Sequence, residues 1–135
     1  MKKLVERRKQ WNFTPFPYDL TVIVSNDITA SRNKHFPHHP YSHDKYTAAL
    51  TNAAEDLPNA IIFLDNSSNI NSIAHEVSHV VWYFMKFIGA KPENEFQAYY
   101  IGWLTYEVAK FVLDKKKKVR YTKKVKANQA EMPRY

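Results

Sequence analysis

A chain of 135 residues with 44% hydrophobic and 15% aromatic content fits one folded domain with a hydrophobic core, and this composition excludes an intrinsically disordered protein. The absence of cysteine excludes disulfide frameworks and thiolate zinc sites, so a transition metal would need histidine and carboxylate ligands. The net charge of +7 belongs to one end of the chain, because residues 1–114 hold 11 Lys/Arg and 12 Asp/Glu whereas residues 115–135 hold 9 Lys/Arg and a single Glu.

The first third of the chain predicts an arm, a strand and a loop. Residues 1–19 are basic and then rich in aromatic residues and proline, which favours a short helix or arm against the body. The β-branched run at residues 20–25 predicts a strand. Asp27 is suited to cap a short helical turn through Arg32. The prolines and histidines of residues 33–45 predict a loop.

The next segment predicts a hairpin. Residues 46–53 and 60–64 have the length and composition of two strands, and the residues between them, 56–59, favour a turn that makes the strands antiparallel. Together with strand 20–25, they predict a small, mainly antiparallel sheet.

A long helix is predicted from about Ser72 to Ile88, because its apolar residues recur at steps of three and four. Asn69 or Asn71 is placed to cap its start, and Gly89 is placed to end it. Aromatic residues at helical spacing in this helix and the next predict core packing rather than a cofactor site: Trp82, Tyr83, Tyr100, Trp103 and Tyr106.

A second helix is predicted from Pro92, which suits the first helical position, to about Leu113. The fold class is therefore α+β, with one domain over residues 1–114 in which a small sheet packs against two long helices. Residues 115–135 form a separate basic tail, either frayed helix or disordered.

The first long helix contains the sequence H-E-V-S-H at residues 75–79. Residues four apart lie on one face of a helix, about 40° apart, so His75 and His79 can bind one zinc ion together. The carboxylate of Glu76 can then reach a water on the metal and act as a general base. The alternative is a chance match, with two polar histidines on a half-exposed face and a solvated Glu76.

A catalytic zinc site usually has three protein ligands, and no third histidine follows His79 closely. The second helix offers a carboxylate on a stripe of residues at steps of three and four: Glu95, Ala98, Tyr99 and Gly102. Because Ala98 and Gly102 are small, they would let this helix pack closely against the zinc helix and bring Glu95 to the metal. Glu93 is the competing ligand, and the alternative for Glu95 is a surface residue favoured by the helix dipole.

With H-E-x-x-H on one helix and Glu95 on the next, the chain resembles the gluzincin group of zinc metallopeptidases. The pair Glu95 and Ala98 is similar to the E-x-x-A-D pattern of several of those families, with Tyr99 in place of an aspartate that orients a ligand histidine. The short loop between the helices resembles the minimal single-domain members, the minigluzincins, and small phage or bacterial metallopeptidases. The resemblance covers roughly residues 58–112.

The resemblance implies a zincin-like domain that uses Zn²⁺ to hydrolyse peptide bonds in a peptide or protein substrate. Glu76 would pass the proton of the attacking water to the leaving amine. Tyr99, Tyr100 or a histidine of loop 35–43 would stabilise the oxyanion, unless these are core tyrosines and solvated loop histidines. Strand 60–64 would line the cleft and accept a peptide along its edge, unless it is an interior strand.

Residues 115–126 contain eight Lys/Arg in twelve positions. Such a segment can bind nucleic acid or an acidic protein partner through its charge, or it can be a solvated terminus. A second class of function is therefore a non-enzymatic zincin-like module whose tail holds such a partner. An intact Glu76 favours the enzyme, because a purely structural metal site needs no base.

The sequence also predicts the compartment. Its charged start is not followed by an apolar run, and its longer apolar stretches are interrupted within a few residues, so we expect no export signal and no membrane association. Without cysteine, nothing indicates an oxidising compartment. We expect a cytoplasmic protein, and the resemblance implies a bacterial or phage-infected cell.

Overall fold

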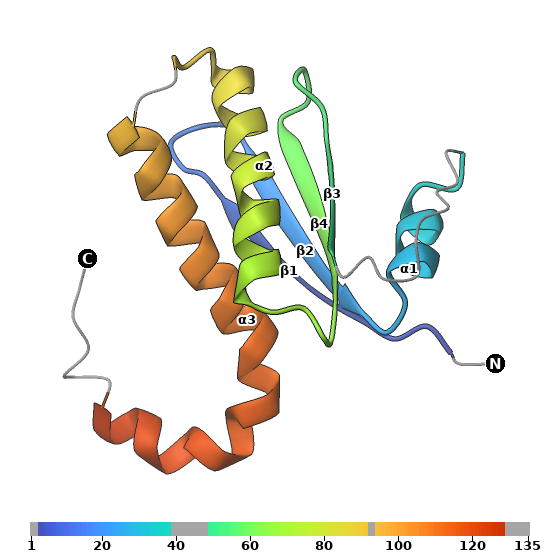
Figure 1. Cartoon of the computed structure of the whole chain (residues 1–135), viewed down its shortest axis with the longest axis vertical. Helices are drawn as coiled ribbons and strands as arrows, with labels where there is room; N and C mark the ends of the chain where they lie inside the picture. The colour runs from blue at the N-terminus through green and yellow to red at the C-terminus, as the bar shows by residue number, and fades with distance from the viewer. Residues whose placement is uncertain (1–2, 39–48, 92–93, 129–135) are drawn as a thin grey trace.

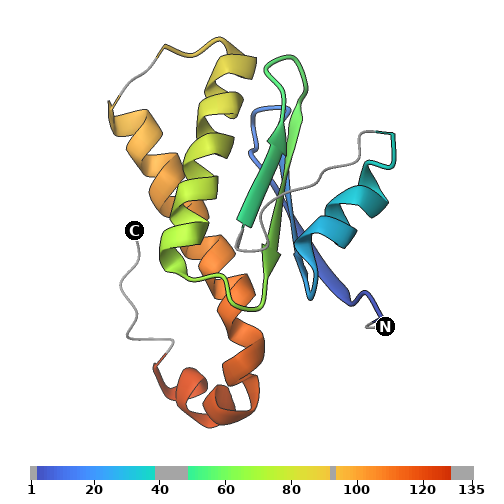
Figure 2. The same ribbon diagram turned by 45° about the vertical axis from the view of Figure 1, so that its right-hand side comes forward.

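The computed structural model describes residues 3–38, 49–91 and 94–128 (Figure 1). Within these ranges the chain forms a mixed sheet of four strands and three helices, which confirms the predicted α+β class. Helices α2 (Ile70–Ile88) and α3 (Asn94–Asn128) lie side by side on one face of the sheet, and α1 (Ile28–His35) lies on the other (Figures 1 and 2). None of the helices in the described ranges is both long enough and apolar enough to cross a membrane.

The strands are β1 (Glu6–Asn12), β2 (Asp19–Ser25), β3 (Ala49–Ala53) and β4 (Asn59–Asp65), in the spatial order β1-β2-β4-β3. β1 pairs antiparallel with β2, and β3 pairs antiparallel with β4. The central pair, β2 and β4, is parallel, which the prediction of a mainly antiparallel sheet did not include. The predicted residues 46–48 of the third strand lie outside the described ranges.

The prediction of a helix or arm over residues 1–19 is wrong for residues 6–12, which form β1. This strand is at the edge of the sheet, and its exposed middle residues are Arg8, Lys9 and Gln10, so no apolar alternation indicates it. Its stability comes from distant partners. Trp11 is buried, and the Arg7 guanidinium donates hydrogen bonds to the carbonyls of Phe111 and Val112 in α3, at 2.9 and 2.7 Å.

The helix caps agree with the sequence. The Asn69 side chain accepts a hydrogen bond from the backbone N–H of Ser72 at 2.9 Å, and Gly89 ends α2 in the left-handed conformation with φ of 72°. Asp27 caps α1 by accepting from the N–H of Ala30 at 3.0 Å. The predicted start of α3 at Pro92 lies outside the described ranges.

Helix α3 is longer than expected. It continues past the predicted end at Leu113 to Asn128, so the basic segment 115–126 has a helical backbone. In Figure 1 the last part of α3, in orange to red, extends past the end of the sheet and curves. The helix therefore consists of a part that packs on the domain and a part that continues beyond it.

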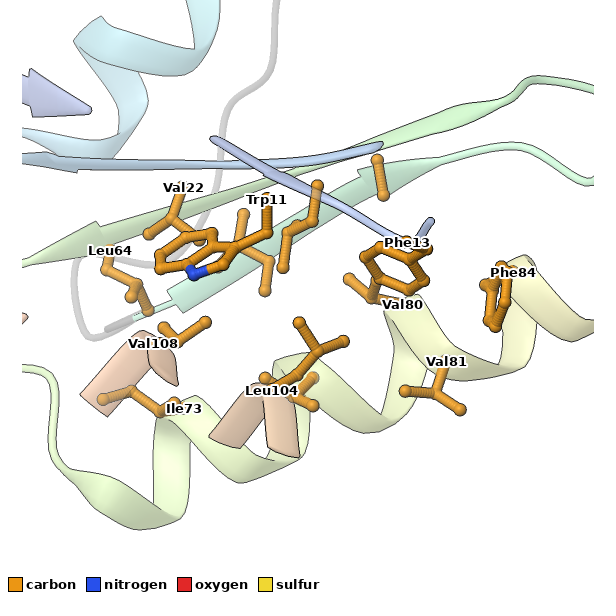
Figure 3. Close-up of a cluster of buried hydrophobic side chains, with 14 of the residues drawn as sticks. Trp11, Phe13, Val22, Leu64, Ile73, Val80, Val81, Phe84, Leu104 and Val108 are labelled. Atoms are coloured by element: carbon orange, nitrogen blue, oxygen red, sulfur yellow. The ribbon is translucent and has the colours of Figure 1, made fainter. Parts of the chain in front are cut away.

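The main hydrophobic core fills the space between the sheet and helices α2 and α3 (Figure 3). Every second residue of β2 and β4 faces this core, as strand geometry requires. The core side chains that Figure 3 labels come from β1, β2, β4, both helices and the segment after β1: Trp11, Phe13, Val22, Leu64, Ile73, Val80, Val81, Phe84, Leu104 and Val108. A second, smaller cluster beneath α1 contains Ile23, Ile28 and Phe63.

The expectation of buried aromatics holds only in part. Tyr100 and Trp103 pack against the main core. Trp82 and Tyr106, by contrast, are exposed, because each lies on the side of its helix that faces away from the sheet. Their exposure leaves apolar surface on both long helices.

Candidate metal centre

Helix α2 has a buried apolar face and an exposed face that carries two histidines. Its buried apolar residues face the sheet, as predicted, and His75 and His79 lie on the exposed side. Glu76 lies at the boundary between the two and is buried, with 8% of its surface exposed. One rigid helix therefore places two solvent-accessible imidazoles beside a buried carboxylate.

The three side chains converge. The Nε2 atoms of His75 and His79 are 3.2 Å apart, and His75 Nε2 is 3.9 Å from Glu76 Oε2. One ligand atom from each of the three residues lies within 4.8 Å of the others, and in the described part of the chain this is the group that could hold a metal ion.

The spacing of the imidazoles fits a shared ion. Zn²⁺ binds histidine nitrogen at about 2.0–2.1 Å in tetrahedral geometry, which puts two ligand nitrogens about 3.3 Å apart. The observed 3.2 Å between the Nε2 atoms matches that separation. Without a metal, the same distance allows the protonated Nε2 of one ring to donate a hydrogen bond to the unprotonated Nε2 of the other. The donor set therefore fits a divalent ion that accepts imidazole ligands.

Glu76 is held by a residue that the sequence did not indicate. Thr51 in β3 donates a hydrogen bond from Oγ1 to Glu76 Oε1 at 2.7 Å, and the same hydroxyl is 3.4 Å from the Glu76 carbonyl oxygen. A buried carboxylate needs such a partner. Oε1 therefore accepts the hydrogen bond from Thr51, whereas Oε2 is the oxygen near His75. Thr51 precedes Glu76 by 25 residues in a short strand, and no motif links them.

Glu95 and its neighbours do not join this group. The predicted close approach of Ala98 and Gly102 to α2 is wrong, since both are exposed, and a Cβ added at Gly102 would meet no atom within 4 Å. Glu95 and Tyr99 lie on the same exposed stripe, and Glu95 is not part of the metal-binding group. The side of α3 that packs on α2 carries other residues, among them Phe96, Tyr100 and Leu104.

The arrangement of the elements explains this result. Helix α2 lies between α3 on one side and β3 on the other (Figures 1 and 2). Glu76 contacts Thr51 and therefore lies on the β3 side, whereas α3 packs against the opposite side of α2. Glu95 is not in the group of described residues that could hold a metal ion. Its role as a zinc ligand and that of Tyr99 as an oxyanion donor stay predictions.

Glu93 and residues 39–43 of the predicted loop lie outside the described ranges. His35, by contrast, is the last residue of α1 and contacts Glu6 of β1 rather than the histidine pair.

Comparisons of the chain with protein-family models, with curated proteins and with solved structures find no match. Membership of the gluzincin group therefore stays a prediction. Its support is the cluster of His75, Glu76 and His79.

The strand expected to present an edge to a peptide is an interior strand. β4 pairs with β2 on one side and β3 on the other, so of the two interpretations of residues 60–64, a free edge or an interior strand, the interior strand is correct. Among the described strands, β3 forms the edge of the sheet on this side. It is also the strand that supplies Thr51, so the sheet edge and the candidate metal centre are adjacent.

Proposed function

We propose that this chain is a metal-dependent peptidase in which His75 and His79 bind Zn²⁺ and Glu76 is the general base. The observation that carries the proposal is the 3.2 Å separation of the two Nε2 atoms, with the Glu76 carboxylate in the same cluster. A purely structural metal site would not need a base beside its ligands. The cluster therefore favours hydrolysis over a structural role.

A zinc ion at this site would supply Lewis acidity for attack on a carbonyl group. The residues of the chain divide the remaining work. Thr51 fixes Oε1 of Glu76. Oε2, on the imidazole side, takes the proton from the attacking water and passes it on to the leaving amine. Because Glu76 is buried and hydrogen-bonded, its carboxylate keeps one orientation during both transfers.

The substrate class follows from the strand beside the cluster. An extended peptide can add to a free strand edge through backbone hydrogen bonds. β3 offers such an edge among the described strands, and its Thr51 contacts the proposed base. We therefore propose that a peptide or an unfolded protein segment binds along β3 rather than along β4.

Metal content and hydrolysis test the proposal together. The purified protein should contain about one zinc ion per chain, and His79→Ala should lose it. Glu76→Gln should keep the metal and lose hydrolysis of a peptide library, because it removes the base and leaves both imidazoles in place. Glu95→Gln reports on the third ligand: loss of zinc would make Glu95 a ligand, and retention would exclude it.

The outcome that overturns the proposal is equally specific. A wild-type protein that binds no zinc with at least micromolar affinity would contradict the metal centre. Zinc binding with no hydrolysis of any library peptide would support the alternative, a non-enzymatic binding module.

One structural observation supports the alternative function, a non-enzymatic binding module. Helix α3 continues as a helical backbone through residues 115–126, which hold eight Lys/Arg, so the positive charge is carried on a regular element. A basic helix attracts phosphate backbones, with an affinity that falls steeply with salt. A salt-sensitive DNA shift that disappears when residues 115–135 are deleted would support this second candidate.

A further inference from the structure

Helix α3 has one face that no described part of the chain covers. Tyr99 is 65% exposed, Tyr106 51% and Leu113 37%. These residues recur every seven positions, so they lie along one line of the helix. Single exposed apolar residues are ordinary, whereas an aligned set of large ones marks an interaction surface. We call the exposed residues on this side the α3 face: Glu95, Tyr99, Gly102, Tyr106, Lys110 and Leu113.

Gly102 lies in the middle of this face. Glycine lowers the stability of a helix interior, so it usually has a packing reason there. No contact within the described part of the chain supplies the reason, because a Cβ added at Gly102 would meet nothing there within 4 Å. A glycine on an exposed helix surface allows the backbone of another helix to approach closely.

The two charged residues of the face indicate which partner would bind to it. Glu95 and Lys110 are both exposed and flank the two tyrosines, with the Lys110 amino group 5.9 Å from the centre of the Tyr106 ring. In an antiparallel pair of α3 helices with a two-fold axis between Gly102 and Trp103, Glu95 lies opposite the partner's Lys110. Tyr99 then lies opposite the partner's Tyr106. The face is complementary to itself, as a two-fold interface requires.

A parallel pair would lack this complementarity. It would place each Glu95 beside the partner's Glu95 and each Lys110 beside the partner's Lys110, and like charges in contact are repulsive. The charge order along the helix therefore favours the antiparallel arrangement.

We propose that this chain forms a two-fold homodimer through the α3 face, with the two α3 helices antiparallel and in closest contact at Gly102. The face is exposed and lies opposite the side of α3 whose Phe96 and Tyr100 pack on α2, whereas Glu76 of the candidate metal-binding group contacts β3. Dimerisation leaves His75 and His79 accessible, and it does not depend on the proposed peptidase activity.

The expected affinity follows from the size of the face. From Glu95 to Leu113 the helix spans about 27 Å at 1.5 Å per residue. A contact between two helices of this length is at the small end of protein interfaces. We expect a dissociation constant of roughly 1–100 µM.

Sedimentation equilibrium of the full chain, over about 1–500 µM and with a chelator present, tests the dimer. Glu95→Lys alone and Lys110→Glu alone should each weaken dimerisation roughly tenfold, because both ion pairs of the dimer become repulsive. The double variant should restore it, since the charges are exchanged and again complementary. Glu55→Lys, the same charge change in the β3–β4 turn, should have no effect.

A monomer throughout this range would overturn the proposal. So would a double variant that dimerises no better than either single variant, because the antiparallel register requires the rescue.

Cross-linking gives a second measurement that does not rest on charge. The chain has no cysteine, so Gly102→Cys introduces a single thiol beside the proposed two-fold axis, and the open space around Gly102 lets the helix accept it. Mild oxidation should convert this variant to a covalent dimer faster than Glu55→Cys. Equal rates for the two variants would contradict close contact at Gly102.

Discussion

Thr51 links the edge strand to the proposed base. Its hydroxyl has one proton to donate, and the 2.7 Å contact to Glu76 Oε1 is much shorter than the 3.4 Å contact to the Glu76 carbonyl oxygen. The bond leaves Oε2 as the oxygen that faces His75. Thr51 thus fixes one oxygen of Glu76, and under the proposed function it would be a positioning residue for the base.

We expect Thr51→Val to lower kcat about 10–100-fold while zinc content stays at the wild-type level, since the imidazoles are unchanged but the carboxylate loses its support. Thr51→Ser keeps the hydroxyl and should retain most of the activity. Peptide hydrolysis and metal analysis on the same preparations check this. Loss of zinc from Thr51→Val would indicate a general collapse of the site instead.

A half-buried carboxylate, Glu6, attaches α1 to β1. Glu6 accepts hydrogen bonds from Ser31 Oγ, from Lys34 Nζ at 2.8 Å and from His35 Nε2 at 3.1 Å. Burial raises the pKa of Glu6, but the hydrogen bonds from Lys34, Ser31 and His35 lower it by more, so the pKa lies below its ordinary value of 4.5.

A lowered pKa in the folded state means that ionised Glu6 stabilises the fold above its unfolded-state pKa, and that this contribution is lost as the pH falls through the folded-state value. We expect Glu6→Gln to reduce the free energy of unfolding by about 1–2 kcal/mol at pH 7, with a smaller difference from wild type at pH 3. Urea denaturation at both pH values measures this. The exposed Glu55→Gln is the control and should show neither effect.

At the scale of elements, the sequence predicts those whose signals are local. The caps at Asp27, Asn69 and Gly89 are where the sequence indicates, because each depends on one side chain and the backbone next to it. β1 could not be predicted in this way. Its middle residues are polar, and the bonds from Arg7 reach partners in α3 that are 104 and 105 residues away in the sequence.

A different limit of prediction from sequence appears on α3, at the stripe of Glu95, Ala98, Tyr99 and Gly102. Periodicity identifies residues that share a face of a helix, but it does not say what that face contacts. The small size of Ala98 and Gly102 suggested packing on α2, whereas α2 packs against the side that carries Phe96 and Tyr100. The juxtaposition of the two histidines was predictable because both candidate ligands lie on one helix, whereas a third candidate ligand requires the placement of a second element.

The exposure of Gly102 leads to a stability prediction. Gly102→Ala should raise the free energy of unfolding by about 0.5–1 kcal/mol, because the added Cβ meets no atom and alanine favours the helix. Gly89→Ala is the matched control: at φ of 72° alanine is strained, and the variant should be destabilised by about 1–2 kcal/mol. Thermal unfolding at low protein concentration, where the chain is monomeric, checks both. Destabilisation by Gly102→Ala would mean that the glycine is packed.

At the scale of the whole molecule, α2 has two neighbours with separate roles. On one side, β3 supplies Thr51 to the metal-binding group. On the other side, α3 completes the core through Phe96, Tyr100 and Leu104. This division leaves the outer surface of α3 free to interact with a second chain without covering the two histidines.

Among the described side chains, the core reaches Val112 of α3, just before the basic segment. Val112 is the last buried residue of the described core, and the carbonyls of Phe111 and Val112 accept the hydrogen bonds from Arg7. The eight basic residues of segment 115–126 come after this point, and the helical backbone continues through them. The described core residues of α3 and the basic segment therefore occupy successive stretches of one helix.

Deletion of residues 115–135 should consequently change the free energy of unfolding by less than about 0.5 kcal/mol, because it removes no residue of the described core. The same deletion removes nine Lys/Arg and one Glu, which takes the net charge from +7 to −1. Binding to heparin or DNA at low salt should be lost with it, since phosphate and sulfate recognition depends on these charges. Urea denaturation and a salt-gradient heparin column measure the two effects. A large loss of stability would show that the segment packs on the domain, and retained heparin binding would assign the polyanion affinity to residues 1–114.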